Sequence, residues 1–249
     1  MIITFPPSLF RLLLLFPPFF HFTSYLFLFL YQTYCHMESV GQVWTLIARF
    51  SNIDTKNWMD DTGSWWYDRN VPFGSTTDPS SNADMISPAF WLVSGREFKI
   101  TRSDDPQHTT LLQTSGDCLG GQTFRAKITG YGDFRNGEPW ELILSGCLGN
   151  CTVQYGGQYE ITKGFARAKC NGSFLNADKV GFWCHLNWDG SVVMIGGGGG
   201  DCGRTYHGLG ITGAEMASFV KGSRPEADFG DSPYSSGITK AYSLNLWIR

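Results

Sequence analysis

Two aspartates on either side of a glycine run are the side chains best suited to bind a metal ion. Asp189 precedes the five glycines at 196–200, and Asp201 follows them directly. Carboxylate oxygens are ligands that hard divalent cations prefer. Five consecutive glycines lose much backbone entropy on ordering, so a folded protein keeps them where the backbone passes close to another segment. The pattern predicts a metal site beside a tightly packed glycine segment.

The residues after the glycines exclude two kinds of nucleotide-binding loop. A phosphate loop ends in Gly-Lys-Ser/Thr, because an amine and a hydroxyl must reach the phosphates and Mg²⁺. Here Asp201 and Cys202 take those places. A dinucleotide loop needs a helix directly after its glycines, and residues 201–207 have no helical pattern.

No catalytic constellation accompanies the candidate metal ligands. The chain has no nucleophile elbow and no zincin motif. Cys184 and His185 could suggest a thiol and its base, but neighbours on a strand point to opposite faces. We therefore expect a protein that is not an enzyme.

Two further residues near the aspartates could contact a ligand. Trp188 stands beside Asp189 in an expected turn, where its ring could stack on a ligand. His207 follows Asp201 after a short segment and could join the site, although a hydrogen-bonded loop histidine is the commoner case. Other aspartates in loops could bind calcium or begin turns; they are Asp60, Asp61, Asp68, Asp78, Asp84, Asp104 and Asp105.

Cysteines and glycosylation sequons favour an extracellular location. Six cysteines after residue 100 could form three disulfides, whose pairing the sequence leaves open. They are Cys118, Cys147, Cys151, Cys170, Cys184 and Cys202. Zinc is the weaker reading, because no second Cys knuckle follows Cys147 and Cys151. Asn150 and Asn171 begin Asn-X-Ser/Thr sequons, so we expect a secreted protein.

The composition predicts one packed domain preceded by a hydrophobic leader. The 249 residues are 42% apolar and 16% charged, with a formal net charge of −3. That charge provides no basic field for nucleic acid. Residues 1–36 contain Arg11 as their one formally charged side chain, and resemble a signal peptide or signal-anchor. The alternative is a mispredicted segment before a start at Met37. Residues 40–249 form the expected domain.

Strand patterns dominate that domain. Alternating or continuous apolar residues predict strands within 43–50, 95–102, 123–132, 179–186, 191–195 and 240–249. In 95–102 the alternation predicts a half-buried strand, with Lys99 and Thr101 on the polar side. In 240–249 apolar residues alternate with Ser243 and Asn245, which predicts a strand. One helix is expected over 212–220, with Thr212 as its cap and Glu215 completing a capping box.

Several stretches in a shared order resemble the intelectins, which are secreted lectins with a fibrinogen-like C-terminal domain. The stretches are "VWTLIARF", "PFGSTTDPSSNADMISPAFWLVSGREFKITR", "YGGQYEITKGFARAKCNG", "MIGGGGG" and "YSSGITKAYSLNLWIR". The resemblance covers nearly all of residues 40–249. It implies an α+β, fibrinogen C-terminal-like fold, with a twisted and mostly antiparallel central sheet, short helices, long loops and disulfides.

The resemblance also implies a calcium-dependent glycan site. In intelectins, residues before and after the glycines bind Ca²⁺, and two hydroxyls of a microbial sugar complete its coordination between aromatic rings. By position, Asn187, Asp189 and Asp201 would be oxygen ligands here, and Tyr234 would be a flanking ring. Ser191 and Val192 stand where the family has Glu and His.

Two functions follow as expectations. The first is a secreted, calcium-dependent lectin that recognises cell-surface or microbial glycans, with a role in innate immune recognition. It would gain avidity as a homo-oligomer, and Cys35 could link chains if it survives processing. It would be bound to a membrane only if the leader is retained as an anchor. The alternative is an extracellular matrix or adhesive fibrinogen-related protein that binds no sugar.

Overall fold

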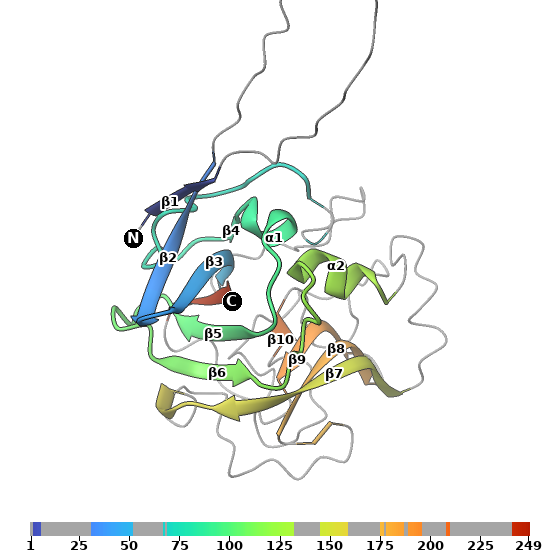
Figure 1. Ribbon diagram of the computed structural model, residues 1–249. Coiled ribbons are helices and arrows are strands. Elements are labelled where there is room, and N and C mark those ends of the chain that lie inside the picture. Colours follow the sequence, from blue (N-terminus) through green and yellow to red (C-terminus); the bar gives the residue numbers. More distant parts are fainter. Residues whose placement is uncertain are drawn as a thin grey trace, which may run out of the picture.

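The computed structural model describes residues 2–5, 31–51, 67, 69–131, 145–158, 175–176, 178–186, 189–195, 208–209 and 241–249. In these ranges the chain forms a mostly antiparallel sheet with short helices (Figure 1). The strands are β1 (Ile2–Phe5), β2 (Tyr31–Ser39), β3 (Gln42–Ser51), β4 (Met85–Ile86), β5 (Phe98–Arg102), β6 (Thr110–Thr114), β7 (Ser145–Tyr155), β8 (Lys179–Leu186), β9 (Asp189–Ile195), β10 (Gly208–Leu209) and β11 (Ser243–Ile248). The helices are α1 (Ala89–Leu92) and α2 (Phe124–Thr129).

The strand order places the last strand in the middle of the sheet. The order is β1-β2-β3-β11-β5-β6-β7-β8-β9-β10, with β4 paired to β3. β11 pairs antiparallel with both β3 and β5, and Figure 1 shows the C-terminus beside them. The described part of the chain therefore confirms the coarse expectation of an antiparallel α+β protein with short helices.

Five expected strands are present, one of them being β5, which lies within the segment predicted at 95–102. β3 lies over the predicted 43–50 strand and is buried from Trp44 onward, as its apolar sequence indicates. β8, β9 and β11 lie within or over the segments predicted at 179–186, 191–195 and 240–249. The helix expected over 212–220 lies outside the described residues.

The prediction of a half-buried strand at β5 is wrong, and the polar residues of β11 are buried as well. Lys99 and Thr101 of β5 and Asn245 of β11 are each 0% exposed. Both strands are interior to the sheet, and residues from other parts of the chain cover their polar face, with Glu38 and Trp44 over Lys99. Asn245 Nδ2, for example, donates to the Pro79 carbonyl over 2.8 Å. Alternation of polar and apolar residues shows that the two faces of a strand differ in polarity. It does not show whether the polar face contacts water or another part of the chain.

The segment 123–132 forms helix α2, and the predicted strand there is wrong. Phe124 and Ile128 are one helical turn apart and are both fully buried. Residues spaced by four share a helix face as well as a strand face, so the pattern was ambiguous. The Thr123 side chain favours the helix over a strand, because its hydroxyl accepts from the Ala126 amide at 3.1 Å and caps the first turn.

The main core lies on one face of the sheet. Phe98 of β5 contacts Phe124 of α2 edge to face, with centroids 5.2 Å apart, and Phe182 of β8 lies 6.1 Å from Phe98. Trp183 Nε1 donates to the Ile128 carbonyl at 2.8 Å, which ties α2 to β8. This burial of aromatic area is the main force that holds the helices on the sheet.

The sheet begins before the expected domain boundary. β2 pairs antiparallel with β3, with Cys35 opposite Thr45 and His36 opposite Trp44. Residues 31–36, which we expected to precede the domain, are therefore part of the sheet in this structure. Cys35 is 1% exposed, so it could link two chains only after β2 leaves the sheet.

Two disulfides join strands and loops of the second half. Cys118 binds Cys151, and Cys147 binds its directly paired neighbour Cys184 across β7 and β8. A Cβ at Gly181 would clash with Sγ of both Cys147 and Cys184, so glycine is required beside this bridge. The expected disulfide stabilisation is confirmed for these four cysteines. Cys170 and Cys202 lie outside the described residues.

Candidate functional site

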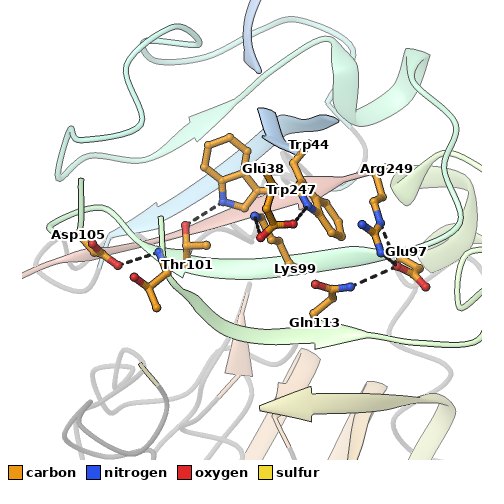
Figure 2. Close-up of polar contacts among 10 residues, drawn as sticks. Glu38, Trp44, Glu97, Lys99, Thr101, Asp105, Gln113, Trp247 and Arg249 are labelled. Atoms are coloured by element: carbon orange, nitrogen blue, oxygen red, sulfur yellow. Dashed lines mark hydrogen bonds and ion pairs between the residues drawn. The ribbon is translucent and has the colours of Figure 1, made fainter. Parts of the chain in front are cut away.

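The second face of the sheet carries a group of charged and aromatic side chains around the buried Lys99 (Figure 2). Lys99 of β5 is 0% exposed, and its Nζ lies 3.5 Å from Oε1 of Glu38 on β2. The same amine lies 4.9 Å from the Trp44 ring centroid. Arg249 stacks on Trp44 too, with Cζ 4.4 Å from the centroid. We call Glu38, Trp44, Lys99 and Arg249 the Lys99 cluster.

Hydrogen bonds hold the partners of Lys99 in place. The indole Nε1 of Trp44 donates to Glu38 Oε2 at 2.9 Å. Arg249 donates from Nη2 and Nε to Glu97 Oε2, at 2.7 and 3.0 Å. Charge-assisted bonds of this kind are stronger than neutral ones, and they orient both the ring and the carboxylate toward the buried amine.

Burial and pairing act in opposite directions on the two charges. Burial lowers the pKa of Lys99, and the nearby Glu38 carboxylate offsets part of that effect. Burial raises the pKa of Glu38, but the Trp44 hydrogen bond and the Lys99 charge outweigh it, so this pKa is lowered. The 3.5 Å distance between Lys99 Nζ and Glu38 Oε1 is that of an ion pair. Because the amine is sealed from solvent, it cannot meet a substrate, and the Lys99 cluster acts as a structural ion pair.

A second group, the histidine cluster, lies beside the first and consists of Tyr34, His36, His108 and Trp247. His36 of β2 and His108, between β5 and β6, contact edge to face with centroids 5.0 Å apart. Trp247 of β11 lies 5.1 Å from His108, and its Nε1 donates to Thr101 Oγ1 at 2.8 Å (Figure 2). Neither cluster was expected from the sequence. The alternation of Lys99 and Thr101 in one predicted strand, and of Asn245 and Trp247 in another, was the sequence pattern that could have indicated a polar cluster on one face.

Arg49 holds a loop over this face. Its side chain, on β3, is fully buried. The guanidinium donates to the carbonyls of Ala83, Asp78 and Ser75. Five donors in a fixed planar fork suit such multiple contacts. The loop before β4 is thereby positioned by one cation from the sheet.

Two of the loop aspartates stabilise turns. Asp78 Oδ1 accepts from the Ser80 amide at 2.9 Å and the Ser80 hydroxyl at 2.6 Å. These bonds lower the pKa of Asp78. Asp105 accepts from the amides of Gln107 and Thr109, at 3.0 and 2.8 Å. These contacts support the turn interpretation of both residues.

The other described aspartates of that set also have protein partners. Asp84 Oδ1 accepts from the Ser51 amide at 2.7 Å. Asp104 pairs with Arg102 at 2.6 Å. The remaining members of the set, Asp60, Asp61 and Asp68, lie outside the described residues.

One predicted metal ligand can be located on the backbone. Asp189 is the first residue of β9 and pairs with Leu186 of β8. β9 ends at Ile195, directly before the glycine run. Six predicted site features lie outside the described residues, namely Asn187, Trp188, residues 196–200, Asp201, His207 and Tyr234. Among the side chains that the structure describes, no three His, Cys, Asp or Glu gather closely enough to hold a metal ion.

The first sequon lies on the surface of the sheet. Asn150 of β7 is exposed and pairs with Gly181 of β8. Its neighbour Cys151 is bonded to Cys118. Asn171, in the second sequon, lies outside the described residues. In the described ranges no helix is long and apolar enough to cross a membrane.

No model of a known protein family matches the chain, and no curated protein matches it.

Proposed function

We propose that this protein is a secreted, calcium-dependent glycan-binding protein with a fibrinogen-like domain. The observation that carries the proposal is the position of Asp189. Asp189 is the first residue of a strand that ends at Ile195, directly before the glycines at 196–200 in the sequence. Asp201 directly follows those glycines. The intelectin-like order of sequence stretches supports the same reading.

The strand that begins at Asp189 is joined to two further strands, which supports the proposal. β9 pairs with β8, which is bonded to β7 through Cys147 and Cys184. Calcium takes six to eight oxygens, and Asn187, Asp189 and Asp201 would supply protein oxygens. Sugar hydroxyls would complete the coordination, and Trp188, His207 and Tyr234 would flank the sugar.

The two disulfides support secretion. Disulfides persist in oxidising compartments and are rare where thiols are kept reduced. Cys118–Cys151 and Cys147–Cys184 lie in the described sheet, and Asn150 is exposed for glycan attachment. A homo-oligomer would raise the avidity of weak single-sugar contacts.

A glycan array tests the proposal directly. The full chain, expressed by a secreting cell, is applied with calcium and then with EDTA. We expect binding that EDTA abolishes and that Asp189→Asn reduces at least about tenfold. Asp178→Asn is the matched control, because Asp178 is an exposed carboxylate beside the start of β8. Binding that survives EDTA, or that Asp178→Asn reduces as much as Asp189→Asn does, would contradict the proposal.

One observation favours the alternative, a fibrinogen-related matrix or adhesive protein without sugar binding. Val192 stands where intelectins have a histidine, and here it is 0% exposed in the main core. A buried valine supplies no ligand to an ion or a sugar. Binding to no glycan, together with a calcium-dependent rise of the melting temperature, would support this alternative.

A further inference from the structure

His108 is a buried histidine in a place that is poor for a positive charge. It is 6% exposed, and its Nδ1 has no hydrogen-bond partner among the described residues. Its ring contacts the rings of His36, Trp247 and Tyr34, at centroid distances of 5.0, 5.1 and 5.8 Å. A neutral imidazole fits this aromatic surrounding, and an imidazolium would lose its hydration there.

The charges that face His108 are mostly positive. His36 and Lys99 each oppose a proton on His108, as does the charge of the amino terminus, while Asp105 favours one. Asp105 already accepts from two amides of its own turn. Burial first, and then His36 and Lys99, lower the pKa of His108 from 6.5 to about 4.

His36 faces a similar balance from the opposite strand. Burial lowers its pKa first, Lys99 and the amino terminus lower it further, and the Glu38 carboxylate raises it. The two rings touch, so a proton on either one disfavours a proton on the other. When both are protonated, two adjacent positive charges lie beside the buried amine of Lys99.

The contact between the two histidines joins different parts of the sheet. His36 is on β2, and His108 follows β5, on the far side of β3 and β11 in the strand order. Two hydrogen bonds also join β2 to the loop before β4. The Tyr34 amide donates to the Thr76 carbonyl, and Thr76 Oγ1 donates to the Gln32 carbonyl. Repulsion within the histidine pair would act directly on the attachment of β2.

We propose that His36 and His108 form an acid-sensitive latch, which holds β2 on the sheet while both rings are neutral and releases it when they are protonated. The latch is a property of the fold and does not depend on glycan or calcium binding. Release would expose the side chains by which β2 packs on the sheet, among them Cys35 of β2 itself, which is 1% exposed in the closed state.

Labelling of the Cys35 thiol reports the release of β2. The full chain reacts with 4,4′-dithiodipyridine at about pH 7.5 and at about pH 4.5, and each rate is divided by that of a small thiol at the same pH. Cys35→Ser identifies the signal from this residue. We expect the normalised rate to rise at least about tenfold in acid. The pKa of His108 is lowered from 6.5 to about 4 in the closed state, and this difference allows protonation to favour release of β2 by more than that factor.

Variants separate the latch from general acid effects. His108→Phe and His36→Phe keep aromatic rings and cannot be protonated, and each should reduce the acid-induced rise below about threefold. Tyr34→Phe is the matched control in the same cluster and should keep the full rise. If His108→Phe labels rapidly even at neutral pH because packing is lost, His36→Phe alone decides.

Three results would overturn the latch. One is a normalised rate that is equal at both pH values. Another is a full acid response in both histidine variants. The third is loss of the whole far-UV circular dichroism signal at the pH where labelling rises, because the latch releases β2 and leaves the remaining sheet folded.

Discussion

The Nζ atom of Lys99 lies 3.5 Å from Oε1 of Glu38, although the lysine side chain is 0% exposed and the glutamate side chain is 39% exposed. The pair thus joins a charge in the interior to one that still contacts water. A buried charge that loses its partner is costly, whereas a buried pair replaced by apolar groups can be neutral. We therefore expect loss of one partner of the Lys99–Glu38 pair to destabilise the fold more than replacement of both by uncharged side chains.

Removal of the Glu38 charge should destabilise the protein more than removal of both charges. Glu38→Gln should lower the free energy of unfolding by about 1–3 kcal/mol, because it leaves Lys99 buried beside a neutral amide. Lys99→Met together with Glu38→Gln should recover most of that loss. Urea denaturation of the two variants and the wild type measures the difference. Equal losses in the single and double variants would argue against an ion pair.

The stability of the fold should depend on pH through His108. Its pKa is lowered in the folded state, to about 4, from a reference of 6.5. The neutral form is therefore favoured by folding, and this contribution is complete above pH 6.5 and is lost as the pH falls toward 4. The upper limit is about 3.5 kcal/mol, since one pKa unit corresponds to about 1.4 kcal/mol.

Urea denaturation between neutral pH and about pH 4.5 tests this dependence. The wild type should lose stability over the range, and His108→Phe should lose distinctly less. A steeper loss in His108→Phe than in the wild type would show that another group controls the acid response.

The two observed disulfides should be found chemically and should stabilise the domain. Digestion without reduction should yield peptides that link Cys118 to Cys151 and Cys147 to Cys184. If all six cysteines are oxidised, the remaining bridge must join Cys170 to Cys202. The paired change of Cys118 and Cys151 to Ser should cost about 3–4 kcal/mol by the loop-entropy estimate, for a separation of 33 residues. Peptides that link Cys147 to Cys151 would contradict the structure.

The start of helix α2 should be sensitive to the Thr123 hydroxyl. Thr123→Ala removes the bond from the Ala126 amide and should cost about 1 kcal/mol. Thr123→Ser keeps a hydroxyl and should cost much less. Thermal unfolding of the two variants measures the contrast, and equal shifts would indicate that the cap does not stabilise the helix.

The sequence alone predicted five of the eleven described strands, namely β3, β5, β8, β9 and β11. Val43 to Phe50 is apolar on both faces, and it forms a buried interior strand as expected. The alternation in 179–186 and the apolar run in 191–195 mark β8 and β9 equally well. These predictions depend on hydrophobic periodicity, which is a property of residues that are close together in the sequence.

Pairings between distant segments were decided by the tertiary structure. Nothing near Lys99 in the chain indicates that Glu38 and Trp44 will cover it, or that Arg249 will stack on the same ring. The same holds for the contact of His36 with His108 and for the choice of cysteine partners.

Local sequence therefore determined the apolar periodicity, the cysteine content and the acidic residues beside the glycine run. The folded sheet decided which polar side chains are buried, because β11 from the end of the chain lies between β3 and β5. On the second face of these strands, Glu38 contacts Lys99 and a loop held by Arg49 contacts Asn245. Burial depends on what packs above a residue, and that covering segment comes from elsewhere in the chain.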